Sequence, residues 1–239
     1  MWNNARTLSR VASAGFLLAS LLTAYEVLWR VAQLNVFAVR EIRVVGDVGH
    51  VTREQVETVI FRELRGNFFT MDLGAARGAF EKLPWVRQVD VRRRWPDRID
   101  FVIEEHRAIA RWGSTALVND HGEIFEGASN QTLPVFSGPD GTSEEVVQKY
   151  RSFAHALAAI GRHIDEVRLS PRRAWRVRLD DGTAIELGRD AVENRLAAFV
   201  AAYDRTVGQM QARTAYIDLR YANGFAVRIK GMKWGDKRA

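Results

Sequence analysis

The chain has 239 residues, a formal net charge of +6 and no cysteine. Its length suits one large or two small domains, and its 47% hydrophobic and 27% charged residues argue against extensive disorder. The absence of cysteine excludes a disulfide framework and a thiolate zinc site. The net positive charge favours binding to nucleic acid if the chain is cytoplasmic, and contact with anionic headgroups or acidic partners if it lies beside a membrane.

The first predicted element is a membrane anchor over residues 11–36. Val11–Tyr25 carries no charge, and the apolar character resumes after Glu26, which gives about the 20 residues that cross ~30 Å of hydrocarbon. Glu26 and Arg30 are four residues apart, so they share a helix face and can pair. Because the first ten residues contain arginine and no acidic residue, residues 1–10 are predicted to be a cytoplasmic tail. The part of the chain after the anchor is then predicted to lie on the other side of the membrane.

Two other interpretations of this segment are a cleaved signal peptide and a buried core helix. Cleavage after Ala24 would place Leu22 at the −3 position, where a small residue is needed. The apolar run also continues beyond that point. The anchor is therefore favoured over both alternatives.

Residues 37–106 are predicted to form a β-α-α-β-β unit. Phe37–Gly46 is rich in β-branched residues, which favours a strand. Thr52-Arg53-Glu54-Gln55 is a capping box that begins one helix, and Asp72 caps the next. Two runs of alternating residues flank the turn at Pro96-Asp97, with basic residues on one and acidic residues on the other, so a hairpin with cross-strand ion pairs is expected.

The segment from residue 107 onwards is predicted to contain short strands and two helices. Ile109–Val118 and Glu123–Phe125 are expected as strands around a turn, and residues 127–142 as a loop. Ser143 is expected to cap a helix that ends at Gly161.

The remaining predicted elements include a second capped helix and two hairpins. Asp181-Gly182 is expected to join two strands, and Asp190 and Glu193 to cap the helix that follows. Ala215–Tyr221 is expected to be a strand, and Asn223-Gly224 the tight turn of a hairpin. The return strand is expected to place Phe225, Val227 and Ile229 on one face and Ala226, Arg228 and Lys230 on the other. A basic tail, residues 230–239, ends the chain. The fold class is therefore α+β with a mainly antiparallel C-terminal sheet.

Motifs for catalysis are not found in this sequence. It has no phosphate-binding loop, no dinucleotide fingerprint and no HExxH zinc motif, and its five histidines are scattered. Neighbouring carboxylates such as Glu104-Glu105 would point to opposite faces of a strand. Arg92-Arg93-Arg94 is interpreted as a solvated sheet face. We expect no enzyme activity, no metal and no cofactor.

Four stretches resemble the FtsQ/DivIB family of bacterial cell-division proteins, and the β-α-α-β-β unit resembles a POTRA domain. They are LPWVRQVDVRRRWPDRIDFVIEEHRAIARW (Leu83–Trp112), LVNDHGEIF (Leu117–Phe125), PRRAWRVRLDDGTAIELG (Pro171–Gly188) and YIDLRYANGFAVRIKG (Tyr216–Gly231). Ala108 departs from the family, which usually has proline there.

The resemblance implies a non-enzymatic scaffold of the division septum. Such a protein crosses the inner membrane once as a type II protein, with a cytoplasmic N-terminus and a periplasmic C-terminus. It binds FtsB- and FtsL-like membrane proteins, links early and late division proteins, and uses neither nucleic acid nor a small-molecule substrate. The implied domains are a POTRA domain over 37–106 and a partner-binding domain over 107–239.

In the family the partner adds a strand to the last strand of the second domain. The residues that match the family's contact positions are Arg172, Tyr221, Asn223, Gly224 and Phe225. From the residues alone, the favoured interpretation of Tyr221 is an ordinary core aromatic of a strand, and that of Arg172 is a solvated surface charge.

Two other functions remain as alternatives. One is a POTRA-bearing component of secretion or outer-membrane assembly, although such proteins carry several POTRA units and a β-barrel, and here one unit and no series of barrel strands is seen. The other is a secreted hydrolase, which the missing catalytic motifs disfavour.

Overall fold

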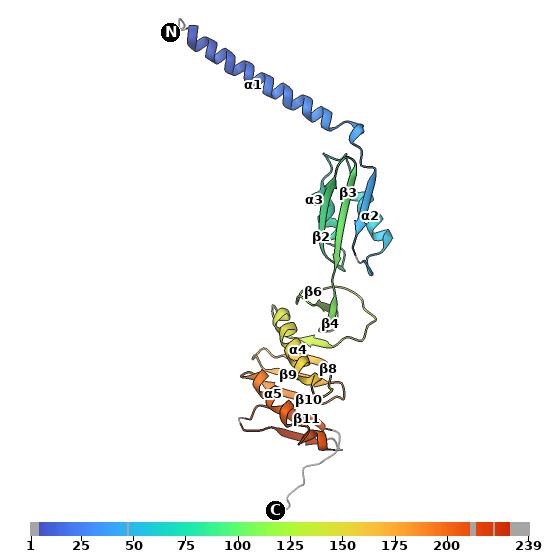
Figure 1. Cartoon of the computed structure of the whole chain (residues 1–239), viewed down its shortest axis with the longest axis vertical. Coiled ribbons are helices and arrows are strands. Elements are labelled where there is room, and N and C mark those ends of the chain that lie inside the picture. The colour runs from blue at the N-terminus through green and yellow to red at the C-terminus, as the bar shows by residue number, and fades with distance from the viewer. Residues whose placement is uncertain (1–4, 47, 211–213, 222, 230–239) are drawn as a thin grey trace, which may run out of the picture. The chain divides into compact units, whose positions relative to one another are not determined.

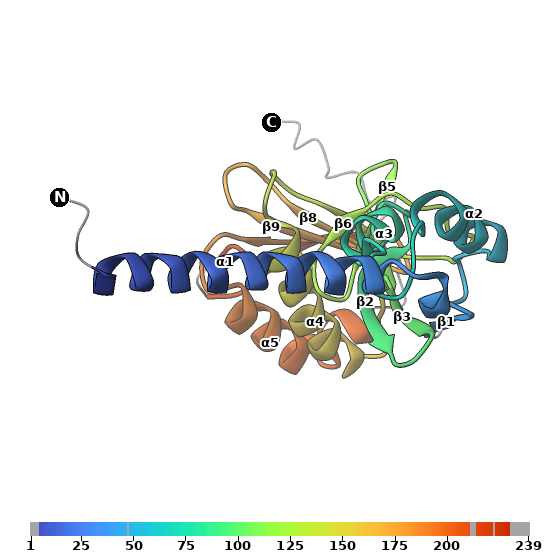
Figure 2. The same cartoon turned by 90° about the horizontal axis from the view of Figure 1, so that it is seen from above.

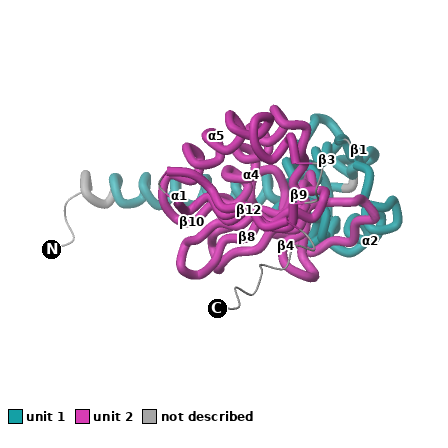
Figure 3. The backbone as a smooth tube through the Cα atoms, turned by 90° about the horizontal axis from the view of Figure 1, so that it is seen from below, with its two compact units in different colours: residues 1–106 teal, residues 107–239 magenta. Residues whose placement is uncertain are grey.

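The computed structural model describes residues 5–46, 48–210, 214–221 and 223–229. The chain divides into two compact units, residues 1–106 and 107–239 (Figure 3).

The first unit begins with a long apolar helix, α1 (Ala5–Ala32). Its segment Ser9–Ala32 is long and apolar enough to cross a membrane, and none of it is buried inside the protein. Arg30 Nε lies 3.0 Å from Glu26 Oε1, which confirms the predicted pair. The helix ends at Ala32, short of the predicted end of the anchor at residue 36, and a 3-10 turn (Asn35–Phe37) follows.

The predicted β-α-α-β-β unit follows this turn, and its order is confirmed. Its elements are β1 (Glu41–Val45), α2 (Arg53–Glu63), α3 (Leu73–Phe80), β2 (Val86–Arg94) and β3 (Arg98–Glu105). The strand order is β1-β3-β2, with β1 parallel to β3 (Figure 1). The helices contribute Val59, Ala76 and Phe80 to a core shared with sheet residues such as Phe101. The capping box at Thr52 and the cap at Asp72 are both confirmed.

Strand β2 carries a bulge that explains its imperfect alternation. The β2–β3 register shifts between Val86 and Gln88, so Val86 and Val89 both face the core although they are three residues apart. Val91 follows on the same face and is half-buried. The expected cross-strand ion pairs form, with Arg94 Nε 3.2 Å from Asp100 Oδ2.

The second unit is built on one nine-stranded sheet in the order β12-β11-β10-β9-β8-β7-β4-β5-β6. Helices α4 (Ser143–Ala158) and α5 (Val192–Tyr203) lie on the same side of its central strands (Figure 2). The strands are β4 (Ala108–Trp112), β5 (Ala116–Asn119), β6 (Ile124–Phe125), β7 (Val135–Ser137), β8 (Ile164–Leu169), β9 (Trp175–Leu179), β10 (Ala184–Gly188), β11 (Thr214–Asp218) and β12 (Ala226–Ile229).

The two faces of this sheet differ in polarity. In β9, Trp175, Val177 and Leu179 are buried in the core with the helices, while Arg176 and Arg178 are exposed on the opposite face. Five of the eight described strand pairings are antiparallel and three are parallel. The predicted α+β class with a mainly antiparallel sheet is confirmed.

Several strand predictions in this unit are wrong. The expected single strand Ile109–Val118 is two strands, β4 and β5, because a turn at Gly113, with φ of +62°, divides it. The expected loop 127–142 contains β7, which is too short at three residues to show an alternating pattern. Strand β8 was not predicted, and a register shift between Ile164 and Glu166 interrupts its alternation.

The predicted starts of both helices also need correction. Thr142, not Ser143, is the N-cap of α4, and its hydroxyl donates to the Pro139 carbonyl at 2.6 Å instead of accepting from the helix. The N-cap of α5 is Ala191, in the left-handed region with φ of +51°, so Asp190 lies outside the helix. Glu193 lies in the first turn and pairs with Lys149 of α4.

The C-terminal hairpin forms, but its connection is longer than predicted. Asp218 pairs with Ala226, so residues 219–225 connect β11 to β12 in place of a two-residue turn. Tyr221 therefore lies after the strand and not within it. The predicted basic tail, residues 230–239, and Lys230 lie outside the described residues.

Candidate functional site

Strand β12 is the edge of the large sheet. Within the described part of the chain it pairs with β11 alone, whereas β11 lies between β10 and β12. Strand β11 is covered by its return strand, so the edge of the predicted hairpin is β12. An edge strand exposes main-chain N–H and C=O groups that another chain can pair with.

The two faces of β12 alternate as predicted from its sequence. Phe225, just before the strand, and Val227 pack against the core, and the Phe225 ring lies 5.3 Å from that of Phe199 in an edge-to-face arrangement. Ala226 and Arg228 are exposed, and the Arg228 guanidinium lies 5.0 Å from the centre of the Tyr216 ring. Strand β12 thus packs against the core with one face, and its outer edge is available to pair with another strand.

A surface pocket of about 780 Å³ lies beside this edge. Its lining combines tyrosine, carboxylate and strand residues: Tyr216, Asp218, Tyr221, Ala226, Val227, Arg228 and Ile229. Burial raises the pKa of Tyr216, and the carboxylates of Asp218 and Glu186 raise it further. The pocket therefore offers both aromatic surface and polar groups to a ligand.

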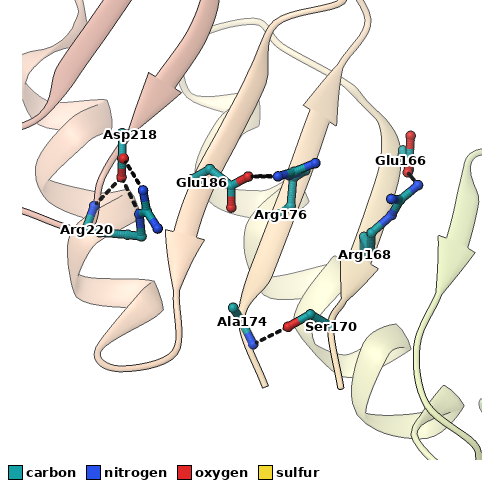
Figure 4. Close-up of polar contacts among 8 residues, drawn as sticks. All are labelled: Glu166, Arg168, Ser170, Ala174, Arg176, Glu186, Asp218 and Arg220. Carbon is teal, nitrogen blue, oxygen red and sulfur yellow. Dashed lines mark hydrogen bonds and ion pairs between the residues drawn. The ribbon is translucent and has the colours of Figure 1, made fainter. Parts of the chain in front are cut away.

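Asp218 and Arg220 shape the chain before Tyr221 (Figure 4). Arg220 Nε and Nη2 donate to the two Asp218 oxygens at 2.8 and 2.6 Å, and the Arg220 main-chain N–H donates at 3.0 Å. These contacts lower the pKa of Asp218, with the Arg220 side chain as the main cause. Between them, the N–H of buried Leu219 donates to the Glu186 carbonyl. Tyr221 follows, 60% exposed, so it does not pack in the core.

Arg172 and Arg173 have different environments in the turn between β8 and β9. Ser170 closes this turn by accepting from the Ala174 N–H at 3.0 Å (Figure 4). Arg173 takes a left-handed conformation, with φ of +64°, and its Nη2 contacts Glu145 of α4 at 2.6 Å. Arg172 is exposed and has no hydrogen-bond or ion-pair partner among the described residues. Of the two, only Arg172 is available to another molecule.

The topology brings Arg172 and Tyr221 to the same end of the sheet. Strand β9 starts where its antiparallel neighbour β10 ends, and β11 runs parallel to β10. The β8–β9 turn and the end of β11 are therefore on one side, two strand spacings or about 10 Å apart across the sheet. Asn223 and Gly224 are exposed in the connection from β11 to β12.

Ion pairs that were not predicted from the sequence cover the helix-free face of the sheet. Arg176 pairs with Glu186 of the neighbouring strand, and Glu166 pairs with Arg168 (Figure 4). Glu166 also pairs with Arg178. The alternation of charged residues in β8, β9 and β10 was the available signal. These charges neutralise one another, so this face is less suited than the edge to hold a charged partner. In the described parts of both units, no cluster of three or more His, Cys, Asp or Glu side chains could hold a metal ion.

Comparisons with known proteins cover nearly the whole chain. Residues 37–106 match the family model "POTRA domain, FtsQ-type", and residues 110–220 match "Cell division protein FtsQ/DivIB, C-terminal". The second match ends just before Tyr221, so Tyr221 and β12 follow it.

Full-length relatives agree with these matches. The chain is 45% identical over 233 residues to the cell division protein FtsQ of Nitrosospira multiformis, which covers 95% of this chain and 99% of that protein. It is 42% identical over 241 residues to FtsQ of Burkholderia pseudomallei, which covers 98% of this chain and 96% of that protein. It is 34% identical over 230 residues to FtsQ of Neisseria gonorrhoeae, with 95% of each covered.

Proposed function

Since this chain belongs to the FtsQ/DivIB family of cell division proteins, we propose that it is a non-enzymatic scaffold of the division septum that binds FtsB- and FtsL-like membrane proteins. In this role it links early and late division proteins. The observation that carries the proposal is the edge strand β12, which packs against the core with one face and lies beside the exposed Tyr221.

The domain layout that we propose is supported by α1 and by the two family matches. Residues 1–10 form a cytoplasmic tail, 11–36 the signal anchor, 37–106 the POTRA domain and 107–239 the partner-binding domain. The protein is then a type II single-pass protein of the inner membrane with its C-terminus in the periplasm. Support comes from the apolar length of α1 and from the basic residues that precede the apolar run.

Membrane anchoring is tested by alkaline carbonate extraction and by protease protection in spheroplasts. We expect the full chain to stay with the membrane and added protease to digest its C-terminal part. Release by carbonate, or a mature protein shortened at Ala24, would contradict the anchor.

We propose that the partner adds a strand to the outer edge of β12. Each main-chain hydrogen bond gained contributes only about 1 kcal/mol net. Affinity must therefore depend on a few side chains, and Tyr221 offers a large rigid contact area at low entropic cost. Arg172 can donate two parallel hydrogen bonds to a carboxylate. Asn223, Gly224 and Phe225 form the remainder of the contact, beside the added strand.

The position of Arg172 sets a requirement for the partner. An added strand lies four spacings from β9, or about 19 Å across the sheet. A strand on β12 alone cannot reach Arg172 in the β8–β9 turn. The partner must therefore contain a second segment that passes the end of the sheet and carries an acidic residue.

Site-specific photo-cross-linking in cells tests this docking mode. A cross-linker in place of exposed Arg228 on β12 is expected to capture the FtsB-like partner. The matched control replaces His155, which is exposed on α4. Capture from both positions alike, or from the α4 position alone, would contradict docking at the edge.

A further inference from the structure

Three segments of the first unit meet where α1 ends. Asn67 Nδ2 donates to the carbonyls of Ala32 at 2.6 Å and Leu34 at 3.3 Å, so loop 66–71 is bonded to the end of the helix. The Arg40 N–H donates to the Asp97 carbonyl at 2.9 Å, which brings in the β2–β3 turn.

Strand β2 ties the loop to this turn. Arg93, near its end, donates from Nε to the Phe68 carbonyl and from Nη2 to the Met71 carbonyl, both at 2.8 Å. The Phe68 N–H in turn donates to the Phe37 carbonyl at 2.8 Å. We call residues 34–40, 65–71 and 92–98 the proximal end.

The proximal end exposes large apolar side chains. Trp95, at the tip of the β2–β3 turn, is 78% exposed, and Phe69 is 48% exposed. Phe69 makes an edge-to-face contact with Phe37 at 5.0 Å, so its orientation is supported. Leu34 and Val36 are also exposed. Aromatic residues in such positions are typical of the membrane–water interface.

Exposed arginines accompany these aromatics. Arg40 contacts Asp97 only at 3.8 Å, and Arg92 contacts Asp90 only at 3.9 Å. The side chain of Arg65 is exposed and has no ion-pair partner among the described residues. Weakly paired cations beside exposed aromatics suit the phosphate groups of an anionic lipid surface.

The depth of the proximal end follows from α1. Tyr25 and Trp29 stack on the helix and Arg30 follows them, a combination that anchors a helix at the headgroup level. Ala32 lies three residues beyond Trp29, a rise of about 4.5 Å. A headgroup layer is roughly 6 Å thick on each side of the hydrocarbon. Loop 66–71, bonded to Ala32, therefore lies in or against this layer.

We infer that the proximal end of the POTRA domain rests on the periplasmic leaflet, with Trp95 and Phe69 in the interface and the arginines on anionic phospholipid headgroups. This inference rests on the proposed membrane anchoring of α1. The bilayer then contacts and restrains the folded POTRA domain itself, in addition to holding α1.

The test uses the full chain in lipid nanodiscs that contain about 30% phosphatidylglycerol, a membrane with a negative surface potential. Because the chain has no cysteine, a single introduced cysteine can carry a fluorophore. Asp97→Cys places it in the β2–β3 turn. Gly49→Cys is the control, since a side chain there meets open space and the Gly49 N–H bonds to Glu105 at the far end of β3, about 25 Å away. Lipids with a nitroxide near the headgroup quench a fluorophore within the interface.

We expect at least a threefold stronger quenching at position 97 than at position 49. Trp95→Ser should reduce the quenching at 97 at least twofold, whereas Phe61→Ser, which removes an 85% exposed aromatic from α2, should leave it unchanged. Neutral discs should weaken it, because the arginines lose their counter-charge.

Equal quenching at positions 97 and 49, or no effect of Trp95→Ser, would overturn the inference while the anchor stands. Failure of the chain to co-elute with the discs would instead refute the anchor.

Discussion

Glu105→Gln should strongly destabilise the POTRA domain, because this carboxylate holds the segment before α2. Its oxygens accept from the N–H groups of Gly49 at 3.1 Å, His50 at 3.0 Å and Val51 at 2.8 Å. They also contact His50 Nδ1 at 3.0 Å, and the side chain is only 8% exposed. Hydrogen bonds to a charged group contribute about 1.5–3 kcal/mol each and are not additive. We expect a loss of about 2–3 kcal/mol in the free energy of unfolding, since glutamine keeps the shape but loses the charge.

Urea denaturation of residues 37–106 measures this loss. Glu104→Gln is the matched control. Glu104 is the next residue along the strand, its side chain is 53% exposed, and it pairs with Arg87 at 2.7 Å. An exposed pair of this kind contributes about 0–1 kcal/mol. If both variants lose the same stability, the proposed role of Glu105 is wrong.

The pH dependence gives a second check on Glu105. Burial by itself would raise the pKa of Glu105, but the N–H groups of Val51, His50 and Gly49 and the His50 ring lower it below its ordinary value. The stabilisation is therefore complete above the unfolded pKa of about 4.3 and is lost as the pH falls through the folded-state pKa. The difference between wild type and Glu105→Gln should shrink at acid pH. A difference that stays constant from neutral pH to about pH 2 would refute the reasoning.

Two further predictions concern packing, each with a control built into the chain. Val89 is fully buried, so Val89→Asp should destabilise the POTRA domain by more than ~3 kcal/mol. Val91 is half-buried, so Val91→Asp should cost about 1–2 kcal/mol. Urea denaturation measures both losses, and the reverse order would contradict the β2 register. Gly122→Ala should lower the stability of the second unit by more than ~2 kcal/mol, because the new Cβ would lie 2.4 Å from Glu144 Cα. Gly113→Ala is the control: open space surrounds it, so it should cost only about 1 kcal/mol for its positive φ. Equal effects of the two variants in thermal denaturation would rule out the clash.

The sequence predicted the first unit better than the second, for physical reasons. In the POTRA domain, local signals agree with tertiary structure: the capping box at Thr52 and the cap at Asp72 both form, and the helices and strands follow in the expected order. Only the bulge after Val86 disturbed the pattern. In the second unit, β7 has only three residues and pairs with β4 and β8, which are distant in sequence, and a register shift interrupts the alternation of β8.

The geometry around the proposed contact residues could not be predicted from the sequence. Asn223-Gly224 is a strong hairpin signal, yet Asp218 and Arg220 clamp the chain early and lengthen the connection. Tyr221 thereby leaves the strand and becomes exposed. The Arg172–Arg173 pair shows the same limit, because only the fold reveals that Arg173 is bound to Glu145. Neither the clamp nor that ion pair can be inferred from local sequence spacing.

The central claim, partner docking at the β12 edge, is tested most directly by calorimetric titration of residues 37–239 with a peptide of the FtsB-like partner. Tyr221→Ala should lose over ~2 kcal/mol of binding free energy, a weakening of about thirtyfold or more, and Arg172→Glu should also weaken binding, with a difference that added salt reduces. Phe61→Ala and Arg62→Glu make the same changes on the POTRA domain and should bind normally. Circular dichroism confirms folding of each variant. Normal affinity of well-folded Tyr221→Ala and Arg172→Glu would contradict the claim and move the docking site elsewhere.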